Sequence, residues 1–265
     1  MRQPLHVTRR QFLAGTAAAA GGLLLPSSRN VLAADAAAVP EAGATDHFWY
    51  RVPTVGPHVE SHRDNMAFGF TDDAIHLSDD NAQTWRQSLA FPDARNITFS
   101  HVFKNGNVLF ATRTELFLSA DGLKTYQRIA LKNADGTDYA IHTARNPENP
   151  GWYFAPLAGV NSWQVGDVEM LVWGNYCNVL GGATPPNIYY SVDNGQTVKV
   201  AYAFGQNPYH GDNGGPGGGS GGALLGDPNN PVFCRHIHSV AYNPAENAFY
   251  ACTGDHDRAE GYECH

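Results

Sequence analysis

Residues 191–197 read Ser-Val-Asp-Asn-Gly-Gln-Thr, between the apolar runs Ile-Tyr-Tyr and Val-Lys-Val-Ala-Tyr. Asn and Gly accept the positive φ angles of a tight turn, so this stretch predicts a β-hairpin. The same arrangement occurs at residues 78–85 and 119–126, as Ser-x-Asp, turn residues and then Thr followed by an aromatic residue. We call these three segments the Ser-x-Asp turns. They form an internal repeat, which constrains the fold more strongly than any single element.

Short apolar runs around the turns predict repeated units of four antiparallel strands. In the first unit the strands are expected at residues 47–52, 66–70, 74–77 and 85–90. In the second they are expected at 97–103, 108–112, 115–118 and 126–131. In the third they are expected at 139–143, 168–174, 188–190 and 198–204, with insertions at 146–166 and 175–186. A fourth unit has two predicted strands, 236–242 and 248–253. Each Ser-x-Asp turn joins the third and fourth strands of its unit.

Repeated four-stranded units are typical of the blades of a β-propeller. We therefore predict an all-β protein, with a partial propeller of about three and a half blades over residues 39–265. A complete propeller of this type would have six or seven blades, so we expect the chain to be part of a longer protein. The glycine-rich residues 211–222 predict a flexible excursion or a lid over a site.

The turn sequence resembles the Asp-box (BNR) repeat, Ser-x-Asp-x-Gly-x-Thr-Trp, of sialidase-like propellers. Residues 191–197 match every defined position, and Val198 replaces the final Trp. The turn at 78–85 has Ala82 where Gly is usual, and the turn at 119–126 shifts the Gly by one position and ends in Tyr126. The resemblance covers about residues 47–265 and implies an exported carbohydrate-active protein. The box itself has a structural role, because Ser and Asp side chains can bind backbone N–H groups across the turn.

The N-terminus carries an export signal rather than part of the fold. Residues 8–13 read Thr-Arg-Arg-Gln-Phe-Leu, a twin-arginine motif, and a short apolar run and small residues follow. We assign residues 1–38 to a signal peptide and short linker. The protein would then be periplasmic or secreted, with the twin-arginine translocation machinery as its partner during export. Removing residues 1–33 takes away four arginines and no acid, which changes the net charge from −8 to −12. That charge argues against nucleic acid, and no later segment predicts membrane insertion.

The first strand of each propeller blade lines the central channel, so polar residues on or beside first strands are the candidate site residues. We predict catalytic roles for three histidines and substrate-binding roles for four further residues. The catalytic candidates are His142, His236 and His238, and the substrate-binding candidates are Arg51, His101, Arg145 and Arg235. Strand alternation places His236 and His238 on one face, where two imidazoles favour proton transfer or a metal. Alternatively, each histidine is a hydrogen-bonded filler of the channel.

Two resemblances imply different reactions on an acidic glycan: we expect a glycoside hydrolase of the sialidase type, with a polysaccharide lyase as the alternative. Residues 50–53, Tyr-Arg-Val-Pro, are similar to the motif whose Arg grips the substrate carboxylate in sialidases, which implies this role for Arg51. The later arginines and the Tyr nucleophile of sialidases have no equivalent in this chain. The histidines are similar to those of propeller polysaccharide lyases, which implies His142, His236 or His238 as the base and Arg51 or Arg235 as the neutralising group. In this case the acid would be one of three tyrosines, Tyr153, Tyr176 and Tyr242.

The expected partner is an oligo- or polysaccharide, and a non-catalytic propeller that binds glycan or protein is the remaining alternative. We predict no cofactor and no resident metal. A metal on His236 and His238 would need a third ligand such as His142, Asp255 or His256, and a calcium loop at residues 193–195 would need further acids. Four cysteines allow three disulfide pairings, among which the sequence does not choose.

Overall fold

The computed structural model describes residues 42–44, 49–51, 56–141, 152–176, 184–206, 226–234 and 236–254. The chain divides into two compact units, Met1–Gly56 and Pro57–His265. In the first unit, strand β1 (Ala42–Ala44) pairs antiparallel with β2 (Trp49–Arg51). The predicted signal peptide lies outside the described residues. Every named element in the described ranges is a strand, apart from one 3₁₀ turn, η1 (Ala94–Asn96). The predicted all-β class is therefore confirmed.

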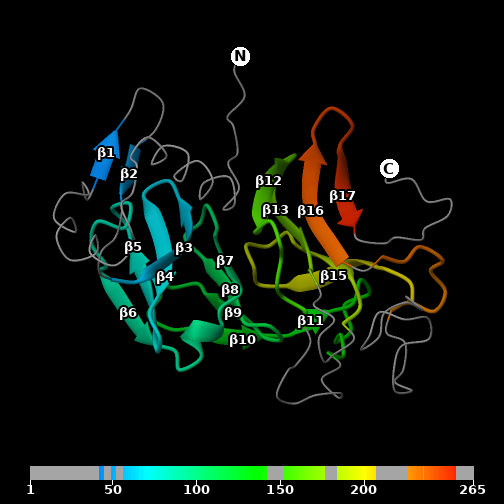
Figure 1. The fold of residues 1–265 in the computed structure, drawn as a ribbon, viewed down its shortest axis with the longest axis horizontal. Helices are drawn as coiled ribbons and strands as arrows, with labels where there is room; N and C mark the ends of the chain where they lie inside the picture. Colours follow the sequence, from blue (N-terminus) through cyan, green and yellow to red (C-terminus); the bar gives the residue numbers. More distant parts are fainter. Residues whose placement is uncertain are drawn as a thin grey trace, which may run out of the picture. The chain divides into compact units, whose positions relative to one another are not determined.

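The second unit contains three consecutive antiparallel sheets and a hairpin (Figure 1). The first sheet has the order β3 (His58–Arg63), β4 (Met66–Phe70), β5 (Ala74–Ser78) and β6 (Gln87–Ala90). The second consists of β7 (Phe99–Val102), β8 (Val108–Ala111), β9 (Leu116–Ser119) and β10 (Gln127–Ile129). The third consists of β12 (Asn161–Val165), β13 (Val168–Gly174), β14 (Asn187–Ser191) and β15 (Val198–Ala203). Strand β11 (Leu131–Lys132) adds to β15 in parallel, and β16 (His236–Asn243) and β17 (Ala248–Gly254) form the hairpin.

The second sheet is buried on both faces, because alternate residues of its strands contribute to two different cores. On β8, Leu109 and Ala111 belong to a core shared with the third sheet, to which Trp173 of that sheet also belongs. Val108 and Phe110 belong to a core shared with the first sheet. This alternation follows from the two-residue period of a strand. Consecutive sheets are thus packed face to face, with the second sheet between the first and the third.

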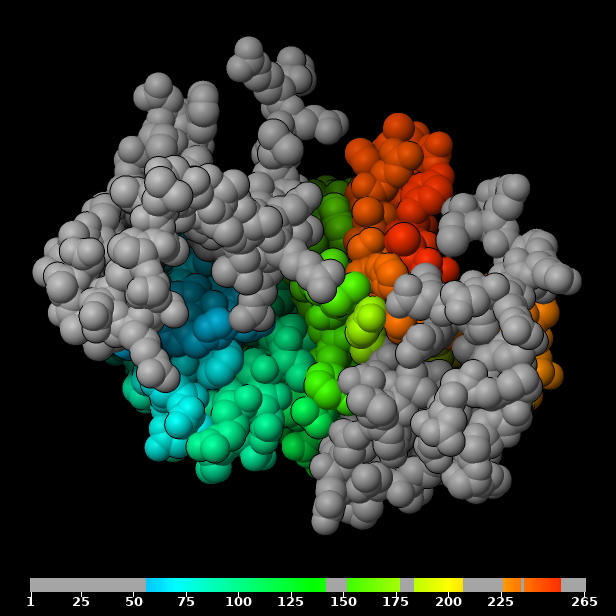
Figure 2. Space-filling view, in the orientation of Figure 1, coloured from blue at the N-terminus to red at the C-terminus, as the bar shows by residue number. Residues whose placement is uncertain are grey.

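The third sheet is also covered on its other side. A smaller core joins Phe204, which follows β15, to Ile237 of the hairpin, and Ile188 of β14 packs against this core. The space-filling view shows the hairpin, in orange and red, beside the green of the third sheet (Figure 2). Each sheet therefore packs on the next one along the chain.

The three Ser-x-Asp turns share one hydrogen-bond pattern. In the turn that begins at Ser191, its Oγ donates to Asp193 Oδ1 at 2.9 Å and accepts from the Gly195 N–H at 3.0 Å. The Thr197 N–H then donates to Asp193 Oδ1 at 2.9 Å. The turns that begin at Ser78 and Ser119 repeat these bonds at the same spacings. The expected backbone-capping role of Ser and Asp is confirmed in all three.

Two predicted strands are wrong. The first strand of the first sheet is β3, whereas the predicted residues 47–52 overlap only β2 of the other unit. The first strand of the third sheet is β12, inside the predicted insertion 146–166, and residues 139–141 are not in a strand. The reason is that β3 and β12 are half-exposed and have the polar sequences HVESHR and NSWQV. A search for apolar runs passes over such strands, and the bounds of the remaining strands are correct to within a few residues.

Candidate functional site

The strands of the second unit bring polar side chains together in two separate groups. The first group, which we call the ring stack, consists of Tyr176, His236 and His238. The second, which we call the Glu169 cluster, consists of five residues: Arg63, His101, Lys104, Ser162 and Glu169. Glu169 lies at the start of β13 and Tyr176 just beyond its end. At the rise of about 3.3 Å per residue in a strand, the two groups lie about 20 Å apart along β13.

The ring stack is formed by the chain after β13 and by the start of β16. The rings of Tyr176 and His236 are stacked, with centroids 4.0 Å apart and planes inclined by 28°. The His238 ring lies 5.1 Å from His236 and 5.8 Å from Tyr176. The prediction that the two histidines share one face is confirmed by this contact. His236 is almost fully buried, whereas Tyr176 and His238 are partly exposed.

A β-bulge and a close backbone contact fix the start of β16. The pairing with β17 slips between Ile237 and Ser239, which leaves His238 as the additional residue of the bulge. Bulges often re-aim a side chain near a functional site. Ile237 is fully buried against Gly174, where a Cβ atom would lie only 2.4 Å from Ile237 Cγ2. Because Gly174 has no side chain, β16 can approach β13 closely enough for the rings to meet Tyr176.

The structure distinguishes the three tyrosines that the sequence offered as acids. Tyr176 is in contact with both histidines. Tyr153 is buried in the core between the second and third sheets. Tyr242 lies toward the other end of β16 and donates a hydrogen bond to Asn247 Oδ1 at 2.8 Å. A phenol and two imidazoles in contact can donate and accept protons, which are the functions of general acids and bases.

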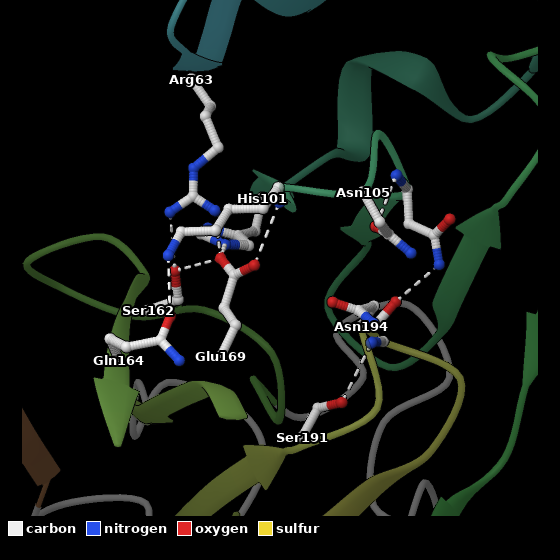
Figure 3. Close-up of polar contacts among 11 residues, drawn as sticks. Arg63, His101, Asn105, Ser162, Gln164, Glu169, Ser191 and Asn194 are labelled. Atoms are coloured by element: carbon white, nitrogen blue, oxygen red, sulfur yellow. Dashed lines mark hydrogen bonds and ion pairs between the residues drawn. The ribbon is translucent and has the colours of Figure 1, made fainter. Parts of the chain in front are cut away.

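The Glu169 cluster joins residues on or beside the first strands of the three sheets, β3, β7 and β12, with Glu169 on β13 (Figure 3). Arg63 Nη1 forms an ion pair with Glu169 Oε1, and Ser162 Oγ donates to the same oxygen at 2.7 Å. The backbone N–H of Lys104 donates to Glu169 Oε2 at 3.0 Å. The His101 Nε2 atom lies 3.7 Å from Oε1, which is an ion-pair distance rather than a hydrogen bond.

The environment of Glu169 keeps it ionised. Burial raises the pKa of its carboxyl, but the His101 ring, Ser162, the Lys104 N–H and the Arg63 charge together lower this pKa to about 2. Burial lowers the pKa of His101, Glu169 opposes that effect, and Arg63 adds to it. A carboxylate with such a low pKa is a poor proton donor near neutral pH. The cluster is therefore better suited to joining the sheets than to acid catalysis.

His101, predicted to bind substrate, belongs to the Glu169 cluster and not to the ring stack. Arg63, Ser162 and Glu169 were not among the predicted site residues. A single acid in the otherwise apolar strand VEMLVWG was a signal that could have identified Glu169. Its partners could not be inferred in this way, since they lie on other sheets.

Several predicted residues lie outside the described residues. These are His142, Arg145 and Arg235, together with the possible metal ligands Asp255 and His256. The backbone of Arg51 is in β2, in the other compact unit. The reason for placing His142 on a first strand no longer holds, because that strand is β12. The glycine-rich residues 211–222 also lie outside the described ranges.

The described ranges contain no group of three or more His, Cys, Asp or Glu residues that could hold a metal ion. Cys234 is buried and Cys252 is exposed, whereas Cys177 and Cys264 lie outside these ranges, so the disulfide pairing remains open. No helix in the part of the chain that the structure describes is long and apolar enough to cross a membrane.

A cavity of ≈ 610 Å³ lies elsewhere, beside the outer strands β9 and β10. Leu116, Ile129 and Phe154 line its apolar part. Its charged wall is the pair of Glu115 and Arg128, with Glu115 Oε1 3.2 Å from Arg128 Nε. Glu115 is partly exposed and Arg128 is largely exposed. The cavity therefore lacks a buried titratable side chain in ring contact, such as His236 against Tyr176.

No family model matches the chain, and no curated protein matches it. The geometry of the ring stack is therefore the basis for proposing a function.

Proposed function

We propose that the chain is part of an exported, Asp-box-type β-propeller that cleaves an acidic glycan at the ring stack. The observation that carries this proposal is the contact of Tyr176 with His236 and His238, at centroid distances of 4.0 and 5.8 Å. The favoured reaction is β-elimination at a uronate residue. The expected location is the periplasm or the exterior, after export by the twin-arginine route.

Two features support the propeller architecture. The second sheet is buried on both faces by its neighbours in sequence, as a blade between two blades would be. The Ser-x-Asp turns, which begin at Ser78, Ser119 and Ser191, have the same bonds at the same place in each sheet. In this proposal the three sheets and the β16–β17 hairpin belong to a disc of six or seven blades.

Exposure assigns the roles within the ring stack. His238 is partly exposed although its Nε2 atom is buried, so its Nδ1 atom would remove the proton α to the uronate carboxylate, that is, the C5 proton of the sugar. The electrons of the C5–H bond form a C4=C5 double bond, and the C4–O bond to the leaving sugar breaks. Tyr176, also partly exposed, donates its phenolic proton to the departing oxygen. His236, which is buried behind Tyr176, orients this ring, and Arg235 would neutralise the carboxylate.

Most glycosidases hydrolyse their substrate with a pair of carboxyl groups, one of which donates a proton. We favour elimination over this kind of hydrolysis. Glu169 is the strongly buried carboxylate among the described residues, and its bonds to Arg63 and Ser162 keep it ionised. A carboxyl group that donates a proton needs a raised pKa instead. Sialidase-type hydrolysis is the principal alternative result of the experiment below.

The test is an assay of the purified exported protein on uronate polysaccharides and on sialosides. We expect absorbance from an unsaturated uronate, and a kcat about 100-fold lower in Tyr176→Phe and His238→Asn, as for loss of a general acid or base. Matched controls are Tyr250→Phe and His58→Asn, which alter exposed residues.

Each other outcome of this assay has a definite meaning. Release of free sialic acid would replace the lyase with a hydrolase. Glycan binding without turnover that is lost in His238→Asn would indicate a non-catalytic propeller. The absence of both turnover and binding across the panel would reject a glycan-directed function.

A further inference from the structure

Asn175 is fully buried between β13 and β14, and both polar atoms of its side chain are engaged. Its Oδ1 accepts from the Asn187 N–H at 2.7 Å, and its Nδ2 donates to the carbonyl oxygen of Pro185 at 3.1 Å. Nδ2 also lies 3.5 Å from the carbonyl oxygen of Trp152. A buried amide is costly unless it is hydrogen-bonded, and this one is satisfied by two other parts of the chain, residues 185–187 and Trp152.

The backbone of the same residue connects β13 to the hairpin. The Asn175 carbonyl oxygen accepts from the Ile237 N–H at 3.1 Å, and its N–H donates to the Asn187 carbonyl oxygen at 3.2 Å. Ile237 is the residue between His236 and His238. The Asn175 carbonyl oxygen therefore helps to hold the start of β16 beside the end of β13, together with the packing of Ile237 on Gly174.

The next residue along the chain is Tyr176, whose N–H donates to the carbonyl oxygen of Ala155 at 2.9 Å. Asn175 is thus the sequence neighbour of Tyr176. It is also hydrogen-bonded to Ile237, the residue between His236 and His238. Asn175 thus contacts both chain segments that carry the stacked rings, whose centroids lie 4.0 Å apart.

We infer that Asn175 is the positioning residue of the ring stack: its side-chain amide fixes the peptide that holds Tyr176 against His236 and His238. The catalytic part of this inference rests on the proposed function, but the geometric part does not. Asn175 does not touch a substrate in this scheme and acts only through Tyr176 and Ile237.

The test uses Asn175→Ala, which removes the amide and keeps both backbone hydrogen bonds. Its matched control is Asn107→Ala, because Asn107 is also a buried asparagine that joins two sheets, through Nδ2 and the Asn194 carbonyl oxygen at 2.9 Å. The first readout is the NMR shift of the imidazole Cε1 protons of His236 and His238, which the Tyr176 ring current displaces. We expect both shifts to move toward free-histidine values in Asn175→Ala and to stay unchanged in Asn107→Ala.

The second readout is turnover of uronate polysaccharide. We expect Asn175→Ala to lower kcat about 10- to 100-fold with KM within about twofold, because misplacement of about 1 Å costs up to 100-fold. If the wild-type protein shows no turnover, the proposed function fails, but the NMR shifts still test the positioning role.

A second variant, Asn175→Ser, protects the test against a failure to fold. Ser retains a hydroxyl that can accept from the Asn187 N–H, so we expect intermediate shifts and an intermediate kcat. A folded Asn175→Ala or Asn175→Ser variant with wild-type histidine shifts would overturn the inference. Equal movement of these shifts in Asn107→Ala would also overturn it, because the effect would then belong to general loosening of the sheets.

Discussion

Arg63 at the end of β3 forms an ion pair with Glu169 at the start of β13, 106 residues further along the chain. The pair bridges the first and third sheets across the second, whose His101 lies 3.7 Å from Glu169. The Glu169 side chain is 7% exposed and that of Arg63 is 22% exposed. Electrostatic contact among β3, β7 and β13 thus supplements the apolar cores that hold the sheets together.

Glu169→Gln should destabilise the protein by about 3 kcal/mol, because removing one partner leaves a poorly solvated charge on Arg63. The free energy of unfolding from denaturant titration at pH 7 measures this loss. The control is Glu115→Gln, which breaks the more exposed pair with Arg128 and should cost less than about 1 kcal/mol. Equal losses in the two variants would mean that the buried pair contributes no more than a surface pair.

His101 should make stability depend on pH near neutrality. Burial lowers its pKa below the ordinary value of 6.5, so the unfolded chain binds a proton more readily than the folded one. This contribution to stability is complete above pH 6.5 and declines as pH falls below it, by at most about 1.4 kcal/mol per pH unit. Denaturant titrations between pH 7.5 and 5 should show a flatter profile for His101→Gln. The exposed-site variant His58→Gln should keep the wild-type slope, and a wild-type slope in His101→Gln would contradict the prediction.

The sequence was sufficient for most of the strands because their signals are local. The turn at Ser191 and the apolar residues on both sides of it predicted β14 and β15, and strand β13 was predicted at the bounds observed. The first strands β3 and β12 were missed because their half-exposed side chains are polar. Hydrophobic periodicity detects burial, and a strand without a fully buried face has little of it.

The same distinction applies to the site. The sequence predicted from strand alternation that His236 and His238 lie together, and their rings are in contact, although the bulge at His238 interrupts that alternation. Tyr176 was one of three candidate tyrosines, and only the packing of β16 on Gly174 selects it. The contacts of Glu169 with Arg63 and His101 could not be predicted, because they depend on how strands of different sheets pack against each other.

The Ser-x-Asp turns should contribute to stability in a pH-dependent way. The Thr84 hydroxyl and N–H, with Ser78, lower the pKa of Asp80 to about 2 from its ordinary value of 3.8. Because the folded pKa is depressed, the stabilisation is present above pH 3.8 and is lost as pH falls from 3.8 toward 2. Melting temperatures should therefore fall in this window, and less steeply for Asp80→Asn, which should also melt lower at pH 7. Asp72→Asn, a change at a largely exposed carboxylate, serves as the control and should follow the wild-type profile.

Substitutions at one backbone position of the Ser-x-Asp turns should stabilise the protein in one sheet and destabilise it in the other two. Ala82, Leu123 and Gly195 each lie four residues after the turn serine, and all have left-handed φ angles, of 60°, 63° and 84°. Ala82→Gly should stabilise the protein by about 0.5–1 kcal/mol, because relief of left-handed strain exceeds the added freedom of the unfolded chain. Leu123→Gly relieves the same strain but removes a fully buried side chain, so a net loss of about 2 kcal/mol or more is expected.

Gly195→Ala completes this set and should cost about 2–4 kcal/mol. A Cβ atom there would lie 2.8 Å from Phe103 Cε2 and 3.0 Å from Leu118 Cδ1, in addition to the strain of the left-handed backbone. The three variants change the same position of the same turn, each in a different environment, so the rank order of their denaturation midpoints is the decisive measurement. Ala82→Gly should exceed the wild type, and the other two should fall below it. A loss of stability in Ala82→Gly would contradict the prediction, because the added freedom of the unfolded chain would then outweigh the relief of strain.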